Sequence, residues 1–113
     1  MAKGSIVLVP FPFDDLTTTK VRPALCLTDP VGPHRHVVLA FITSRVAAEL
    51  PDSDLLLDTG HPDFAGTGLR VASTVRLHRL TTLSASLIRR RLGRLPQALQ
   101  PALDEKLRSL FGL

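Results

Sequence analysis

Proline and glycine interrupt this chain so often that little room is left for long helices. Nine prolines and seven glycines are spread over 113 residues, and most apolar runs between them are short. Apolar runs of about four to eight residues that end at such breaks are typical of β-strands. We therefore expect a small barrel or sandwich of short strands rather than a succession of βαβ units.

Six apolar segments are predicted to be strands. They cover residues 5–9, 21–28, 35–43, 54–58, 69–77 and 88–95. In the fifth segment, Leu69, Val71, Ser73, Val75 and Leu77 alternate with more polar positions, as expected for a strand with two different faces. A short helical turn is predicted at 47–50, before Pro51.

One longer helix is predicted, at the C-terminal end. Pro96 suits the first turn of a helix, and Gly112 suits its end. Between them, leucines recur at spacings of three or four residues, at Leu99, Leu103, Leu107 and Leu110. This pattern predicts an amphipathic helix that covers one side of the barrel.

Length and composition limit the possible classes of protein. A chain of 113 residues corresponds to one domain, predicted over residues 1–113, and 44% hydrophobic residues can form a core. No apolar run reaches about 18 residues and no secretory signal follows Met1, so we expect no membrane association and no export. The single cysteine, Cys26, fits a reducing cytoplasm and an apolar packing role.

The charge balance is basic. The formal net charge is +4 and the isoelectric point is about 10.2. Such a surface suits a polyanion such as RNA. Many small soluble proteins are equally basic without binding nucleic acid, so charge alone leaves both interpretations open.

Two predicted strand ends carry side chains that suit an anion. Arg22 precedes Pro23, which lacks an N–H group and biases the arginine toward an extended backbone. A second apolar run ends in two hydroxyl side chains, Thr43 and Ser44. The planar guanidinium can bind two phosphate oxygens at once, and hydroxyl groups can add neutral hydrogen bonds.

These residues occur in an order that resembles the MazF/PemK family, small bacterial ribonucleases from toxin–antitoxin pairs. The matching segments are Gly4-Ser5-Ile6-Val7-Leu8-Val9 with Phe11-Pro12-Phe13, then Arg22-Pro23-Ala24-Leu25, then Ile42-Thr43-Ser44. The resemblance runs from about Gly4 to Phe111. It implies a mainly β fold, an SH3-like small barrel with the C-terminal amphipathic helix, and a homodimer with RNA in grooves beside the dimer interface.

The resemblance also implies a chemistry. Arg22 and Thr43 match the catalytic arginine and threonine of the family. The residues predicted to contact RNA are Lys20, Pro23, Ser44, Ser73 and Arg76. The implied activity is sequence-selective cleavage of single-stranded mRNA without a metal or cofactor, in which the 2′-hydroxyl attacks and leaves a 2′,3′-cyclic phosphate and a 5′-hydroxyl. A cognate antitoxin would inhibit by folding an acidic, disordered segment across the groove.

Arg22 is expected to stabilise phosphate charge, because an arginine is a poor proton acceptor, and the general base is left unassigned. Departures from the family pattern leave the rate and the cleavage sequence open. Ser5 stands where the family commonly has aspartate, and Val21 stands where some members have histidine. The segment 72–76 lacks an Asp-Gln pair found in some members, and the loop 14–20 is expected to border the RNA groove.

Other interpretations of the same residues stay open. Arg22 would form a surface ion pair with Asp14 or Asp15 in a protein without catalysis. The same barrel also serves in CcdB-like toxins that inhibit DNA gyrase without cutting RNA, which would not need Arg22 and Thr43. A non-catalytic RNA-binding barrel is the third interpretation.

The histidines are predicted to have no joint role. His34 and His36 are expected to be solvated turn residues, no ligand spacing predicts a metal site, and His61 and His78 lie far apart in the sequence. A histidine acid–base pair, as in other ribonucleases, is the alternative, although no histidine falls on the two matching motifs.

Phenylalanines and arginines complete the prediction. Phe11, Phe41 and Phe111 are predicted to be core residues, and Phe13 and Phe64 are the candidates for stacking on bases. Lys20, Arg76 and Arg79 are the candidates for phosphate contacts. The densest basic run, Arg89 to Arg91 with Arg94, is predicted to be a solvated or interface surface.

Overall fold

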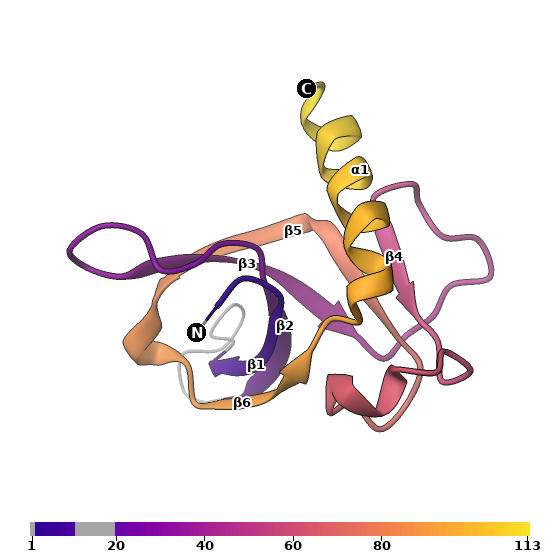
Figure 1. Cartoon of the computed structure of the whole chain (residues 1–113), viewed down its shortest axis with the longest axis horizontal. Coiled ribbons are helices and arrows are strands. Elements are labelled where there is room, and N and C mark those ends of the chain that lie inside the picture. The colour runs from indigo at the N-terminus through magenta and orange to yellow at the C-terminus, as the bar shows by residue number, and fades with distance from the viewer. Residues whose placement is uncertain (1, 11–19) are drawn as a thin grey trace.

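The computed structural model describes residues 2–10 and 20–113, which form an antiparallel sheet that curls into an open barrel, with a helix against one side (Figure 1). The strands are β1 (Ser5–Pro10), β2 (Val21–Cys26), β3 (His36–Thr43), β4 (Asp54–Leu57), β5 (Ser73–Ser84) and β6 (Arg90–Arg94). Their order in the sheet is β4-β5-β3-β2-β1-β6. The helices are η1 (Phe64–Thr67), η2 (Ala85–Leu87), η3 (Gln97–Leu99) and α1 (Gln100–Phe111). The prediction of a mainly β small barrel with a C-terminal helix is confirmed.

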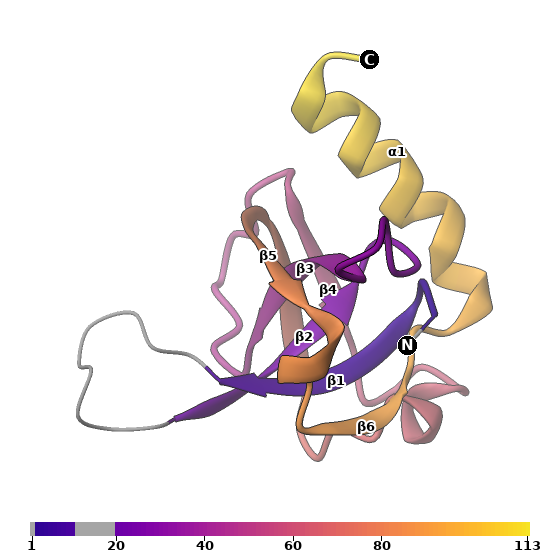
Figure 2. The same ribbon diagram turned by 90° about the vertical axis from the view of Figure 1, so that its left-hand side faces the viewer.

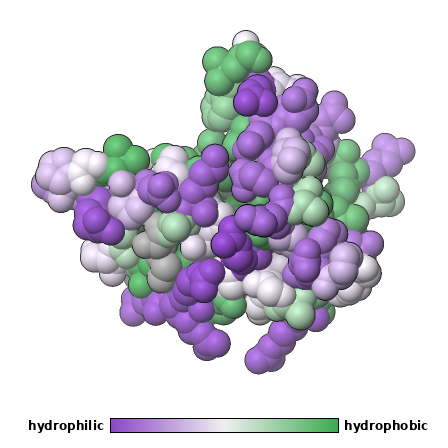
Figure 3. All heavy atoms as spheres, in the orientation of Figure 1, coloured by the Kyte–Doolittle hydropathy of each residue, from purple (hydrophilic) through white to green (hydrophobic). Residues whose placement is uncertain are grey.

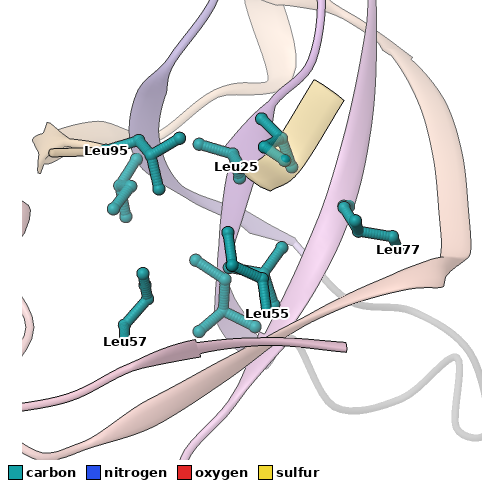
Figure 4. Close-up of a cluster of buried hydrophobic side chains, with 10 residues drawn as sticks. Leu25, Leu55, Leu57, Leu77 and Leu95 are labelled. Carbon is teal, nitrogen blue, oxygen red and sulfur yellow. The ribbon is translucent and has the colours of Figure 1, made fainter. Parts of the chain in front are cut away.

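Successive strand residues point to opposite faces of the sheet and supply two cores. One core lies between the sheet and α1, and Figure 4 shows Leu25, Leu55, Leu57, Leu77 and Leu95 within it. The other lies inside the curl of the sheet and is built from Val7, Val9, Ala24, Cys26, Val37, Leu39 and Phe41. Burial of each valine, leucine, isoleucine or phenylalanine side chain contributes about 1.5–3 kcal/mol, and the two cores together determine which face each strand residue occupies.

The C-terminal helix follows the predicted pattern except at its end. Leu103 is 1% exposed, and Leu99 and Leu107 pack against the same core. The last turn of α1 projects past the sheet (Figure 2), and Figure 3 shows apolar surface at this end of the molecule. Leu110 is 39% exposed and Phe111 is 57% exposed. The prediction that Phe111 is a core residue is therefore wrong, whereas Phe41 is buried as predicted. No helix in the described part of the chain is long and apolar enough to cross a membrane.

The fifth strand differs most from its prediction. It begins at Ser73 and continues to Ser84 because it pairs along the whole length of β3. Its register shifts where Ala40 pairs with Leu80 and the next residue, Phe41, pairs with Arg76. Residues 77–79 thus form a bulge, which changes the direction of the side chains in this part of the strand. The predicted helical turn at 47–50 is also wrong, since those residues form no helix.

Two glycines let the η1 loop lie directly on β6. A Cβ atom at Gly93 would overlap the carbonyl oxygen of Gly66, and one at Gly68 would overlap the carbonyl oxygen of Leu92. Gly68 also has a positive φ of 74°, which favours glycine. Backbone packed this closely fixes the loop that leads from η1 to the start of β5.

We predict that Gly93→Ala destabilises the protein by about 1–3 kcal/mol, because the new methyl group must push the η1 backbone away from β6. Gly66→Ala is the matched control, since a Cβ atom there would meet nothing within 4 Å. Urea unfolding followed by circular dichroism measures both. Equal stability of the two variants would contradict the close packing described above.

Burial of Cys26 raises the pKa of its thiol from the ordinary 9.0 to about 11. We predict that at pH 8 iodoacetamide alkylates the folded protein about 100-fold more slowly than the urea-unfolded chain, because less thiol is ionised. Between about pH 9 and 11 the unfolded chain loses this proton while the folded protein keeps it. The free energy of unfolding should therefore fall with rising pH in that window, and this part of the fall should be missing in Cys26→Ala.

Candidate nucleic-acid groove

A groove of about 520 Å³ opens where β2 begins and β3 ends, and the segment before β5 forms its other wall. Six of the seven predicted site residues line it: Arg22, Pro23, Thr43, Ser44, Ser73 and Arg76. Lys20 is exposed but does not line the groove. Residues far apart in the sequence thus meet at one surface, as the sequence analysis predicted for the two motifs.

Strand pairing brings Arg22 and Thr43 together. The β2–β3 ladder begins where Ala24 pairs with Phe41, and both side chains enter the core inside the curl. Extending the same register by two residues places Arg22 opposite Thr43 on the same face, because side chains alternate. Pro23, between Arg22 and Ala24, has no N–H group to donate to β3. The two side chains therefore lie at the rim of the core, where the ladder ends.

The hydroxyl of Thr43 is held by local backbone. Its Oγ1 atom accepts a hydrogen bond from the backbone N–H of Arg45, with a nitrogen–oxygen distance of 3.2 Å. A threonine hydroxyl has one hydrogen to donate in addition to its acceptor sites. The bond from Arg45 thus leaves that hydrogen for a ligand in the groove. Ser44, the next residue, is exposed.

The groove is strongly positive. Five arginines line it, namely Arg22, Arg45, Arg70, Arg76 and Arg79, and no described aspartate or glutamate does. Within the described residues, no carboxylate forms an ion pair with any of these arginines. The proposed partners of Arg22 in a surface ion pair, Asp14 and Asp15, lie outside the described residues. A cluster of guanidinium groups in a concave surface favours a ligand with several negative charges.

Sequence reasoning missed two of the groove arginines. Arg45 directly follows the Thr43-Ser44 pair, so its position beside the motif was a usable signal. Arg70 was assigned to the fifth strand, but that strand begins three residues later, and Arg70 lies in the preceding loop. Arg79, a predicted phosphate contact, reaches the groove because the β5 bulge carries it there.

Ser73 and Phe64 have structural partners. The Ser73 hydroxyl donates to the carbonyl oxygen of Val71 at 2.9 Å, and the residue is 3% exposed, so its side chain shapes the loop at the groove wall. Phe64 packs against the core beneath α1. The other stacking candidate, Phe13, and the predicted core residue Phe11 lie outside the described residues.

The histidines are spread over different sites. His34 and His36 are exposed in the turn before β3 and at its start, as predicted. His61 accepts a hydrogen bond at Nδ1 from the backbone N–H of Asp63, at 3.0 Å. His78, which sequence reasoning left without a role, lies with its Nε2 atom 3.1 Å from Nη2 of Arg76. Among the described residues, no three histidine, cysteine or acidic side chains are gathered in a way that suits a metal ion.

The remaining basic run lies away from the groove. Arg89, Arg90, Arg91 and Arg94 are exposed on or beside β6, the edge strand on the far side of β1. None of them lines the groove. Their position agrees with the predicted solvated or interface surface, and charged side chains also protect an edge strand from unwanted pairing.

Several solved structures share this fold. The Mycobacterium tuberculosis toxin MazF-mt6 is 28% identical over 96% of this chain and 97% of that one, with a TM-score of 0.74. A MazE–MazF structure from Deinococcus radiodurans (form II) is 21% identical over 100% of this chain and 96% of that one, with a TM-score of 0.76. An endoribonuclease in complex with its cognate antitoxin, from a Mycobacterial species, is 16% identical over 100% of this chain and 96% of that one, with a TM-score of 0.70. The last two likenesses show the fold alone.

The family itself is shown by sequence. No curated protein sequence matches the chain significantly. A family model described as "PemK-like, MazF-like toxin of type II toxin-antitoxin system" matches residues 2–111. That match covers the strands, the groove and α1, and it agrees with the resemblance carried by the Arg22 and Thr43 motifs. The chain therefore belongs to the PemK-like, MazF-like toxins of type II toxin–antitoxin systems.

Proposed function

We propose that this toxin is an endoribonuclease that cuts single-stranded mRNA at selected sequences without a metal ion. The observation that carries the proposal is the meeting of Arg22 and Thr43 in one groove lined by five arginines. Each of the two residues lies two positions beyond the last pair of the β2–β3 ladder, Ala24 opposite Phe41, so the same register carries both motif ends to one side of the sheet. The match to the family of PemK-like, MazF-like toxins and the similarity to the toxin MazF-mt6 support a toxin role for the chain.

In the proposed reaction the 2′-hydroxyl of one nucleotide attacks the adjacent phosphorus, and the bond from phosphorus to the 5′-oxygen breaks. The products are a 2′,3′-cyclic phosphate and a 5′-hydroxyl end. Negative charge grows on the two non-bridging oxygens in the transition state. Arg22 binds those oxygens through its planar fork, and the Thr43 hydroxyl donates its remaining hydrogen to one of them. The 2′-hydroxyl gives its proton to a general base and the departing 5′-oxygen takes one from a general acid, so no net proton is lost, and neither group is assigned.

The remaining arginines suit the rest of the RNA strand. Arg45 and Arg70 lie on loops on either side of the groove, and Arg76 and Arg79 lie along β5. Spacing cationic groups along a groove lets it follow a flexible phosphate backbone, which single-stranded nucleic acid offers more readily than a duplex. Pro23 and Ser44 are proposed to contact RNA from the same rim. Lys20, which stands outside the groove, is proposed to contact the strand beyond it.

The proposal includes a partner and an assembly. Structures of relatives pair MazF with MazE and a mycobacterial endoribonuclease with its cognate antitoxin. A groove lined by five arginines suits an acidic antitoxin segment that would exclude RNA by occupying the same cations. We also propose that the toxin is a homodimer and acts in the cytoplasm, where its mRNA substrate is present. Gyrase inhibition gives no reason for the Arg22–Thr43 arrangement, and no feature of the described residues favours it.

We predict that purified protein cuts a long, weakly structured RNA at discrete sites in EDTA, and that Arg22→Ala and Thr43→Ala each lower the rate about 100-fold or more. Arg22→Lys should remain severely impaired, because a point charge does not replace the bidentate fork. Thr43→Ser should keep much of the activity, because the hydroxyl is retained. Mapping of the 5′ ends, together with a test for cyclic phosphate, measures the reaction.

Arg108→Ala is the matched control for the loss of one positive charge. Arg108 is exposed near the end of α1 and does not line the groove, and alanine is compatible with a helix. Cuts that survive unchanged in both Arg22→Ala and Thr43→Ala would disprove the mechanism. A folded wild-type protein that makes no cuts but binds gyrase would favour the inhibitor interpretation instead.

We further predict that Arg70 contributes one phosphate contact. Affinity for a single strand falls with salt concentration, with a logarithmic slope of about −0.7 for each phosphate contact. Arg70→Ala should make this slope about 0.7 less negative, whereas Arg108→Ala should leave it unchanged. Fluorescence anisotropy with a labelled, mixed-sequence single-stranded DNA, which has no 2′-hydroxyl to react, measures the slope. Identical slopes for wild type and Arg70→Ala would remove Arg70 from the interface.

A further inference from the structure

A chain of polar contacts leads from the interior of the sheet to one groove arginine. Nη2 of Arg76 lies 3.1 Å from Nε2 of His78. On its other side, Nδ1 of His78 lies 2.9 Å from Oγ of Ser53 and 3.6 Å from Oδ1 of Asp54. Asp54 and Ser53 stand at the start of β4 and just before it, outside the lining of the groove.

The chemistry of arginine fixes the proton on this histidine. A guanidinium group has only N–H donors, so the contact with Arg76 requires a lone pair on Nε2 of His78. The proton of the neutral ring must then be on Nδ1. There it faces the Ser53 hydroxyl, which can accept it, and the carboxylate of Asp54. The Nδ1–H tautomer is thus the one that satisfies both sides of the ring.

Asp54 is an unusual residue to find in this position. It is 6% exposed, and its Oδ1 atom has no hydrogen-bond partner among the described residues. Burying a carboxylate without full hydrogen bonding is unfavourable, so a structural role alone is a poor reason for it. Asp54 also stands directly opposite Arg76 in the β4–β5 ladder. The cation that this buried carboxylate faces across the ladder is therefore the groove arginine, with the His78 ring in contact with both.

The bulge in β5 is what permits the arrangement. Residues 77–79 are the extra residues where the β3–β5 register shifts, and the backbone N–H of Leu77 donates to the carbonyl oxygen of Ser53 at 3.0 Å. The bulge is thereby tied to the turn before β4. The same turn is held from the helix, because Nζ of Lys106 donates to the carbonyl oxygen of Asp52 at 2.9 Å. His78 is supported from β4, β5 and α1 together.

We infer that His78, held by Ser53 and Asp54, is a positioning residue that fixes the guanidinium of Arg76 in the orientation that binds an RNA phosphate. The inference rests on the proposed function, since it gives Arg76 its ligand. His78 does not line the groove and acts only through Arg76. A long arginine side chain that is held in place before binding loses less conformational entropy when it binds, so loss of the support weakens affinity.

The first test reads the tautomer and requires no activity. Long-range ¹H–¹⁵N correlation spectra of the imidazole rings, assigned with His78→Gln, should show His78 protonated on Nδ1. His61 is an internal contrast, because its Nδ1 accepts a backbone hydrogen bond and its proton is therefore on Nε2. An Nε2–H tautomer at His78 in the wild-type protein would overturn the proposed contact.

The second test reads the coupling between His78 and Arg76. The dissociation constant is measured by anisotropy with a labelled, mixed-sequence single-stranded DNA, for which cleavage is impossible. His78→Leu should bind about 10-fold more weakly than wild type, the effect expected for loss of one hydrogen bond to a charged group. His78→Gln should stay within about twofold of wild type, because its amide oxygen can accept from Arg76. In an Arg76→Ala background, His78→Leu should cause no further loss.

A loss that persists in the Arg76→Ala background would overturn the positioning role, and so would a His78→Leu variant that is folded and binds as wild type does. Folding is checked by urea unfolding, and His78→Gln keeps the test decisive if the leucine variant unfolds. A wild-type protein that binds no nucleic acid would overturn the proposed function and the RNA role of Arg76. The tautomer would then still decide whether His78 holds Arg76.

Discussion

The central strand β3 pairs with β2 on one side and β5 on the other, and the register of these two ladders determines where Arg22, Thr43 and Arg76 lie in the groove. Ala24 opposite Phe41 sets the first ladder, and Phe41 opposite Arg76 sets the second. A slip of one residue in either ladder would send the side chains of an entire strand to the other face. Because each face carries its own apolar core, such a slip would expose one core and bury charge in the other. The hydrophobic pattern thus places Arg22, Thr43 and Arg76, although none of them belongs to a core.

The groove opens where the paired core residues of β2 and β3 end, at Ala24 and Phe41. Phe41 is the last large core residue before Thr43 inside the curl, and β2 turns polar at Arg22 on the same face. A guanidinium group needs solvent or an anion, so it can be placed at the rim of a core but not one step further in. The groove wall opposite is loop rather than strand, and it depends on Gly68 and Gly93 to bring its backbone onto β6. The core residues therefore determine where the arginines lie, and the contacts of Gly68 and Gly93 position the loop that forms the opposite wall of the groove.

Local patterns predicted the parts of this fold that local physics controls. The apolar runs that end at Pro10 and before Asp29-Pro30 gave strands close to those observed, and leucine spacing gave α1. The extension of β5 past Leu77 was not predictable from its own residues. Polar and apolar residues do not alternate regularly there, and the extension exists because it pairs with β3. The position of Arg70 was not predictable either, because the loop that carries it is held by backbone contacts at Gly68 and at Gly93 of β6. Phe111 was misassigned because helical periodicity does not say how far a helix extends beyond the sheet it covers.

His78 illustrates why a site can stay hidden in a sequence even when its motifs are found. It follows Arg76 by two residues, so in a regular strand the two side chains would share a face without any preference for a particular ring nitrogen. The bulge and the neighbouring turn change that, because they set Ser53 and Asp54 against the opposite edge of the ring. A buried carboxylate with an unsatisfied oxygen is a local departure from what stability favours, and such departures gather where a fold serves a ligand. In this toxin the buried carboxylate is that of Asp54, which is linked to the groove arginine Arg76 through the His78 ring. Neither Asp54 nor His78 lines the groove itself.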